Sequence, residues 1–179
     1  DDLPDLGAAH WAQTIREIKR LNPETTTEVL IPDFQGRKEL VDQVIKACPE
    51  IISHNMETVK RISPQVRSAA NYHTSLEVIR QIAESGITAK SGIMVGLGET
   101  PAEVEELMDD LISVGCKILT IGQYLQPTHK HFPVAAYITP EQFAVYKETG
   151  LKKGFEQMES APLVRSSYHA EKHIRFNNK

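Results

Sequence analysis

Apolar positions along the chain alternate between two spacings, which predict helices and strands in turn. Apolar side chains three or four residues apart predict helices at 6–21, 38–48 and 74–84. Sequences with the capping-box pattern and a proline at the first helical position open two more helices after Thr100 and Thr139. Short apolar runs bounded by turn residues predict five strands, at 26–31, 51–53, 88–95, 117–121 and 155–159. This alternation indicates βαβ units and a parallel sheet, either a barrel or a doubly wound fold.

The first predicted helix has no strand before it. A closed (β/α) barrel needs roughly 250 residues, and this chain has 179. We therefore expect an incomplete barrel that lacks its N-terminal units. Because no repeat or flexible linker divides the sequence, we predict a single domain over 1–179, with an extended C-terminal segment at about 161–179. The chain opens on Asp1 with no basic or apolar leader, which suggests a processed or excised chain.

Composition excludes several classes of protein. With 20 basic and 24 acidic side chains the formal net charge is −4, which argues against an electrostatic nucleic-acid binder. Mean hydropathy is −0.33, and no apolar run is long enough to cross a membrane. Cys48 and Cys116 match no zinc spacing, so we expect buried thiols in a reducing compartment. His129 and His131 lack a nearby carboxylate or cysteine, which favours ordinary loop histidines over a metal site.

Polar clusters follow each predicted strand, where parallel α/β folds gather their ligand-binding groups. Asn55 and Glu57 could take the two hydroxyls of a ribose, or they could stand in an ordinary polar loop. The glycine-rich stretch 92–99 could let backbone amides approach a ligand, or it could be a simple turn. No Gly-x-Ser-x-Gly or Walker sequence is present, which argues against hydrolase and P-loop chemistry. The clusters lie at 33–36, 54–58, 96–99, 123–127 and 160–169.

Taken together and in order, these segments resemble the lipoyl synthase family of radical S-adenosylmethionine enzymes. The resemblance runs from residue 1 to about residue 170, and the two most specific segments are TIGQYLQPT and RSSYH. The matching segments are DDL at 1–3, IPDF at 31–34, HNMET at 54–58, KSGIMVGLGET at 90–100, TIGQYLQPT at 120–128 and PLVRSSYH at 162–169.

The resemblance implies an α/β fold, an incomplete (β/α) barrel of the radical S-adenosylmethionine type with about five parallel strands and helices outside. It also implies cleavage of S-adenosylmethionine at one [4Fe–4S] cluster to give a 5′-deoxyadenosyl radical. That radical abstracts hydrogen from C6 and C8 of an octanoyl group, and an auxiliary [4Fe–4S] cluster gives both sulfurs, so that lipoate is made. The implied partners are an octanoylated lipoyl-carrier domain and an electron donor. The implied location is the cytoplasm, or the mitochondrial matrix in a eukaryote.

The same resemblance assigns roles to positions of this sequence. It places Asn55 and Glu57 at the ribose and gives Ser167, in preference to Ser166, as a ligand of the auxiliary cluster. No catalytic residue is implied for this chain alone. The other implied residues are Gly92, Gly96 and Glu99 around the adenosine, Gln123, Tyr124, Leu125 and Gln126 along the nucleoside and substrate pocket, and Arg165 and Tyr168 beside the serines.

One departure from the family pattern is large. The family carries two cysteine triads toward its N-terminus, one of them Cys-x3-Cys-x2-Cys, and neither occurs here. Each cubane cluster needs about three or four thiolates. We therefore expect a fragment that binds neither cluster and is inactive by itself. Two alternatives remain open: a cluster-less module that binds a nucleoside or a carrier protein, and a cofactor-free barrel enzyme, for which the sequence offers no acid–base pair.

Overall fold

The protein is built on one open, fully parallel sheet. The computed structural model describes residues 3–67 and 70–168. Its strands follow one another in chain order across the sheet, and each pairs in parallel with the next. This order confirms the predicted five-stranded partial barrel, because a doubly wound sheet would reverse its order at a switch point. The strands are β1 (Glu28–Leu30), β2 (Ile51–Ser53), β3 (Thr88–Val95), β4 (Ile118–Gln123) and β5 (Gln157–Ser160).

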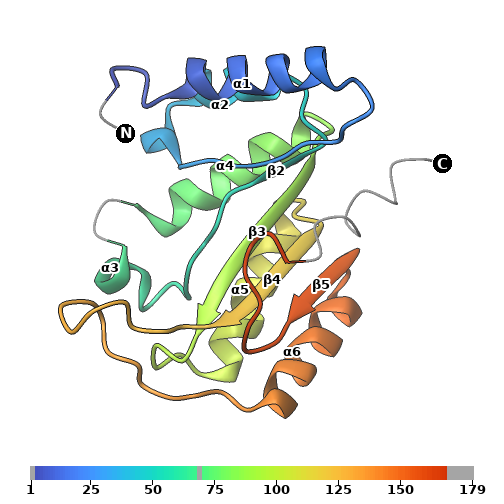
Figure 1. Cartoon of the computed structure of the whole chain (residues 1–179). Helices are drawn as coiled ribbons and strands as arrows, with labels where there is room; N and C mark the ends of the chain where they lie inside the picture. The colour runs from blue at the N-terminus through green and yellow to red at the C-terminus, as the bar shows by residue number, and fades with distance from the viewer. Residues whose placement is uncertain (1–2, 68–69, 169–179) are drawn as a thin grey trace.

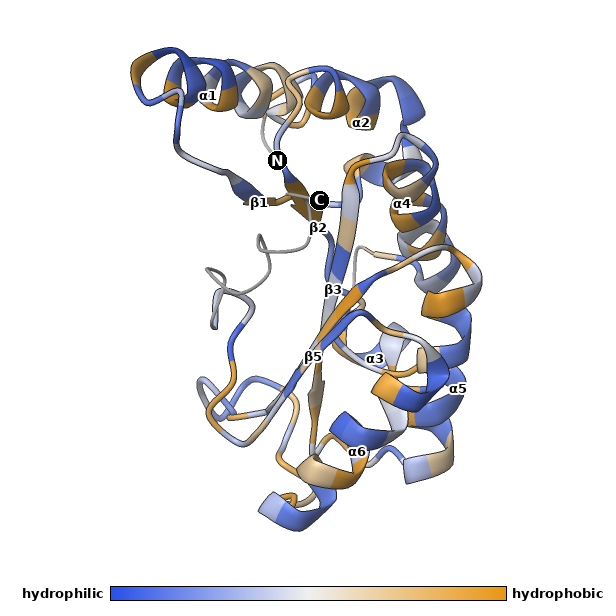
Figure 2. Ribbon diagram, turned by 90° about the vertical axis from the view of Figure 1, so that its right-hand side faces the viewer, coloured by the Kyte–Doolittle hydropathy of each residue, from blue (hydrophilic) through white to orange (hydrophobic). Residues whose placement is uncertain are grey.

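Helices alternate with these strands, as the apolar spacing predicts. The helices α4, α5 and α6 lie on one side of the sheet, and the chain that follows β5 lies on the other (Figures 1 and 2). Two short elements were not predicted, the 3₁₀ turn η1 (Phe34–Gly36) and α3 (Ser63–Val66), because neither is long enough to show a helical period. The longer helices are α1 (Ala8–Leu21), α2 (Lys38–Ile45), α4 (Tyr72–Glu84), α5 (Pro101–Ser113) and α6 (Pro140–Lys153).

Two of these helices begin at the threonines that the sequence marks. Thr100 and Glu103 form the full capping box at α5, with Pro101 at the first helical position. At α6 the side chain of Thr139 accepts a hydrogen bond from the Gln142 backbone N–H. Each cap satisfies N–H groups that have no partner inside the helix. Over residues 3–67 and 70–168, none of the helices has the length and apolar character needed to cross a membrane.

The two faces of the sheet have different chemistry. Successive side chains of a strand point to opposite faces. On the helix-covered face, Ile52, Leu119 and Met158 are buried in one apolar core. The alternate positions form the other face, here called the inner face, and they include charged and small residues such as Lys90 and Gly122. The core therefore stabilises the sheet from one side and leaves the inner face for polar contacts.

Candidate functional site

Two neighbouring cavities open at the carboxyl edge of the sheet, where the sequence predicts a site. The larger has a volume of about 450 Å³ and lies by the ends of β1 and β2, and the smaller, about 270 Å³, lies over β3 and β4. Asn55 and Glu57 line both cavities and therefore stand between them. Among the residues implied by the family resemblance, those that line the smaller cavity are Asn55, Glu57, Gly92, Gln123, Leu125, Arg165 and Ser166.

Glu57 is held in the site by an unusual backbone conformation. Its φ is +64°, in the left-handed region that costs a residue with a Cβ atom about 1–2 kcal/mol. Its backbone N–H donates to Gly92 O at 3.1 Å, and its carbonyl accepts from Met94 N at 2.8 Å. These two bonds fasten Glu57 to β3 as a single parallel bridge. Strain of this kind is concentrated at functional sites, and no pattern in the sequence announces it.

Asn55 packs closely against β3 because residue 92 of that strand is a glycine. A Cβ atom at Gly92 would lie 2.9 Å from Asn55 Oδ1 and 2.7 Å from Thr120 Oγ1, which is too close for either contact. The Oδ1 atom is itself buried, and no residue of the described chain donates a hydrogen bond to it. A buried acceptor without a partner is costly. This oxygen is therefore suited to receive a hydrogen bond from a ligand hydroxyl.

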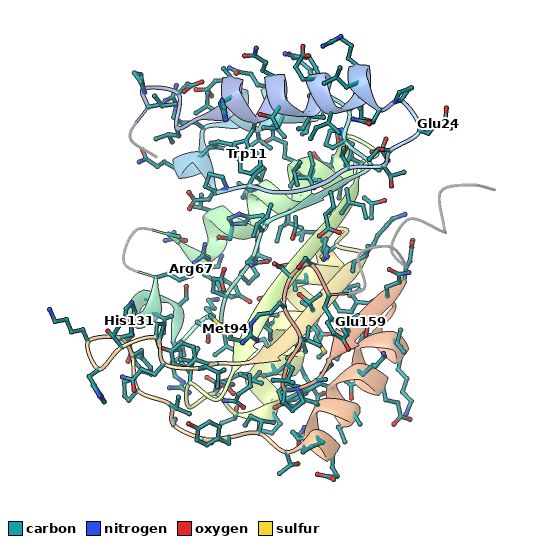
Figure 3. The ribbon with its side chains drawn as sticks, in the orientation of Figure 1. Trp11, Glu24, Arg67, Met94, His131 and Glu159 are labelled. Atoms are coloured by element: carbon teal, nitrogen blue, oxygen red, sulfur yellow. The ribbon has the colours of Figure 1, made fainter. Side chains whose placement is uncertain are left out.

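Beside the larger cavity, His54 joins a directed chain of hydrogen bonds. His54 Nδ1 lies 2.9 Å from Ile31 O, and Nε2 lies 2.9 Å from Ser75 Oγ. Because a carbonyl oxygen can only accept, Nδ1 carries the proton and Nε2 accepts from the serine hydroxyl. Arg67 Nη1 donates to Ser75 Oγ at 2.9 Å and so completes the chain (Arg67 is labelled in Figure 3). The sequence reveals His54 only as part of the 54–58 cluster and gives no sign of its partners.

The buried His54 gives the protein a pH-dependent stability. Burial lowers the pKa of His54 below its ordinary 6.5. As the pH falls toward 6.5, this histidine therefore takes up a proton in the unfolded state before it does so in the folded state. The free energy of unfolding should therefore fall as the pH is lowered from about 7 to about 5. Urea unfolding at a series of pH values measures this slope. His54→Asn should flatten it, and an unchanged slope in that variant would refute the assignment.

The glycine-rich turn after β3 is closed by Glu99. Its Oε1 accepts from Gly96 N at 2.6 Å and its Oε2 accepts from Leu97 N at 2.9 Å. Gly96 has a φ of +101°, which favours glycine. The resemblance implies that Gly96 and Glu99 border a ligand. The structure places both outside the lining of the smaller cavity and gives them a structural part in shaping the turn beside it.

Gln123 also has its side-chain partners within the chain. Its Nε2 donates to Tyr124 O and Ala136 O, each at 3.0 Å, and its Oε1 accepts from Ile138 N at 2.9 Å. The amide thus anchors the long loop between β4 and α6. Tyr124 and Gln126, also implied as pocket residues, hydrogen-bond to Phe132 O and His131 O of the same loop and do not line the smaller cavity.

The two serines after β5 differ in position. Ser166 lines the smaller cavity, whereas Ser167, which the resemblance favours as a cluster ligand, is exposed and outside that lining. Arg165 donates from Nη1 to Val164 O at 2.8 Å, and Tyr168 N donates to Arg165 O at 2.9 Å. Residues 161–168 form no helix or strand, and the rest of the predicted C-terminal segment, 169–179, lies outside the described residues.

The residues that the structure describes do not fit an iron–sulfur cluster. Cys116 is buried as expected, but the expectation is wrong for Cys48, which is exposed because it lies in the turn after α2. Cys48 and Cys116 precede β2 and β4, so both lie at the amino edge of the sheet, opposite the cavities. Burial raises the pKa of the Cys116 thiol to about 12, so this thiol is protonated at neutral pH. Within 3–67 and 70–168, no three His, Cys, Asp or Glu side chains are grouped to hold a metal.

Comparisons with known proteins identify a superfamily and close relatives. The model of the radical SAM superfamily matches residues 2–111. The chain is 99% identical over 179 residues to a lipoyl synthase of Bacteroides fragilis, covering all of this chain and 62% of that protein. It is 61% identical over 175 residues to a lipoyl synthase of Porphyromonas gingivalis, covering 97% of this chain and 62% of that protein. The chain thus spans about three fifths of the length of these relatives.

Two solved structures share the fold. A domain of pyruvate-formate lyase-activating enzyme from Bacteroides vulgatus aligns with a TM-score of 0.61 at 17% identity, over 86% of this chain and 93% of that one. Methylornithine synthase aligns with a TM-score of 0.64 at 10% identity, over 88% of this chain and 53% of that one. At these identities the likeness concerns the arrangement of strands and helices alone.

Proposed function

This chain belongs to the radical SAM superfamily, and we propose that it is the C-terminal part of a lipoyl synthase. The proposed reaction inserts two sulfur atoms, at C6 and C8 of an octanoyl group attached to a carrier protein. The observation that carries the proposal is the pair of acceptors between the two cavities, Asn55 Oδ1 and the Glu57 carboxylate, beside Gly92. The 99% identity to a Bacteroides fragilis lipoyl synthase over all 179 residues supports it.

The acceptors fit the ribose of S-adenosylmethionine. Asn55 Oδ1 lacks a donor within the described chain, and the Glu57 carboxylate is a second acceptor two residues away along the same edge. Two neighbouring hydroxyl groups would donate to this pair, and hydrogen bonds to an ionised acceptor are stronger than neutral ones. When bound, S-adenosylmethionine would supply a 5′-deoxyadenosyl radical and methionine on one-electron reduction by a reduced [4Fe–4S] cluster, and that radical would take hydrogen from the octanoyl chain. The protein's part is to orient the nucleoside and exclude water.

Other residues of the smaller cavity shape the rest of the pocket. The absence of a side chain at Gly92 lets Asn55 pack against β3, and its absence at Gly122 lets the backbone of the segment after β5 approach β4, so that the cavity is bounded on both sides. Leu125 and Met94 add apolar surface, which suits a purine ring or an alkyl chain. Ser166 and Arg165 close the cavity from the segment after β5. Because the described residues do not fit a [4Fe–4S] cluster, the ligands of both clusters would have to come from outside them.

The proposed partners follow from the same reaction. They are an octanoylated lipoyl-carrier domain and an electron donor, and the proposed location is the cytoplasm, because the lipoyl synthases of the comparison are bacterial. A second function is favoured by one observation, the lack of a grouped ligand set for a metal within the described residues. That function is a cluster-less module that binds a nucleoside or a carrier protein.

A fusion experiment tests the proposal. The chain is joined to the part of the Bacteroides fragilis lipoyl synthase that it does not span, and the product is reconstituted with iron and sulfide. We expect it to convert an octanoylated carrier domain to the lipoylated form in the presence of S-adenosylmethionine and a reductant, as detected by mass spectrometry. The unfused chain is the control. A folded fusion that holds both clusters yet forms no lipoyl group would overturn the proposal, and retained binding of S-adenosylmethionine would then favour the module.

A further inference from the structure

The chain after β5 turns back across the inner face of the sheet. Residues 161–168, here called the strap, pass over β4 and then reach β3 (Figure 1). Gln123 N donates to Pro162 O of the strap at 3.2 Å, and Val164 is buried with 3% of its surface exposed. A Cβ atom at Gly122 would lie 2.4 Å from Val164 O, so the strap approaches β4 more closely than a side chain would allow.

One charged side chain ties the strap to the sheet. Lys90 stands on β3 and is completely buried, with 0% of its surface exposed. Its Nζ donates to the backbone carbonyl of Ser166 at 2.5 Å and to Glu28 Oε1 on β1 at 2.5 Å. Because β2 lies between β1 and β3, this single ammonium group joins two non-adjacent strands and the strap.

The sheet itself offers little reason for a buried ammonium group at this position. An ammonium removed from water is costly unless acceptors surround it. Burial lowers the pKa of Lys90, and the Glu28 carboxylate opposes that effect. The strands are already joined by their backbone register, and the apolar core lies on the other face. Beyond the strand register and the apolar core, the contribution of Lys90 is to hold the backbone at Ser166 in one position.

We propose that Lys90 is a positioning residue for the Ser166–Ser167 pair of the strap. By holding the carbonyl group of Ser166, it fixes where Ser166 enters the lining of the smaller cavity and where the chain continues to the exposed Ser167. The inference deepens the proposed function, and it rests on that function for the nature of the ligand that the serines would meet. The contact itself rests on the buried Lys90, its carboxylate partner and the carbonyl of Ser166.

Hydrogen exchange on the full chain, measured by mass spectrometry, tests the contact without any substrate. Lys90→Met removes the charge and keeps a similar side-chain length. We expect amides of the strap to exchange about tenfold to a hundredfold faster, as loss of one bond from a charged donor would give. Amides of β3 and β4 should keep their protection. Lys117→Met is the matched control, because it removes a lysine that does not contact the strap. Lys117 is half exposed, and its Nζ lies 3.0 Å from Glu156 Oε1.

A double variant separates positioning from general stability. Lys90→Met removes the ammonium group that faces the partly buried Glu28 carboxylate, whose side chain is 16% exposed, and this loss by itself would weaken the sheet. Adding Glu28→Gln removes that negative charge, so we expect the urea midpoint to recover. The amides of the strap should still exchange as fast as they do in Lys90→Met. The proposal would be overturned if the strap amides regained their protection in the double variant. It would also be overturned if Lys90→Met left the exchange rates of the strap amides unchanged. Should Lys90→Met fail to fold, the double variant is compared with the parent chain instead.

The reaction provides a separate measurement. In the active fusion, the double variant should lose most of its lipoyl formation, and Lys117→Met should retain it. Full activity in a double variant whose strap exchanges fast would also overturn the positioning role. The exchange experiment needs no catalysis, so a fusion without activity would refute the proposed function and leave the contact between Lys90 and the strap to be judged by exchange alone.

Discussion

Replacing Gly96 by alanine should lower the free energy of unfolding by about 2–5 kcal/mol, the sum of about 1–2 kcal/mol of left-handed backbone strain and about 1–3 kcal/mol of overpacking. The backbone φ of Gly96 is +101°, and an added Cβ would lie 2.3 Å from Gln123 Nε2 and 2.4 Å from Ala136 O. The second of these atoms is backbone and cannot rotate away. The side-chain amide of Gln123 would be displaced, and with it the anchor of the loop between β4 and α6.

Gly98 provides the matched control for this change. Its φ is +98°, nearly that of Gly96, but the nearest atom to an added Cβ is Ala135 Cβ at 3.6 Å, an ordinary contact. Gly98→Ala should therefore show the conformational cost alone, about 1–2 kcal/mol. Urea unfolding of the two variants separates crowding from backbone strain. If Gly96→Ala and Gly98→Ala lower the free energy of unfolding equally, crowding against Gln123 and Ala136 does not contribute to the effect at Gly96.

The sequence predicts the fold well because the fold depends on local patterns. Each of the five strands begins or ends within a few residues of its predicted bounds, since short β-branched runs and turn residues are read from neighbouring positions. The capping box at Thr100 is likewise contained within four residues. The clusters after the strands are brought to one edge by the parallel topology alone, which is why two cavities lie where a site is expected.

The parts of the site that the sequence does not reveal depend on distant partners. Gln123 looks like a pocket residue, yet its amide bonds to groups 13 and 15 residues further along the chain. Lys90 is the one charged residue of β3, and its pairing with Glu28 spans 62 positions of the sequence. The left-handed conformation of Glu57 follows from its bonds to β3 and has no signature of its own. Such contacts become visible only once the strands are placed side by side.

The strain at Glu57 makes stability and binding respond in opposite directions to one substitution. Glu57→Gly should raise the free energy of unfolding by about 0.5–1 kcal/mol, because relief of the left-handed strain exceeds the greater flexibility of glycine in the unfolded chain. The same change removes the carboxylate from the wall between the cavities. In the active fusion, binding of S-adenosylmethionine should weaken about tenfold to a hundredfold, as expected for loss of a charged acceptor.

Cys48 offers a control at the opposite edge of the sheet. It is exposed and has a φ of +56°, close to the +64° of Glu57. Cys48→Gly should give a similar gain in the urea midpoint with no change in binding, measured by isothermal titration. A Glu57→Gly variant that is less stable than the parent chain would show that the carboxylate stabilises the fold more than its backbone strains it. Unchanged binding in that variant would remove Glu57 from the proposed ribose site, leaving Asn55 as its remaining acceptor between the cavities.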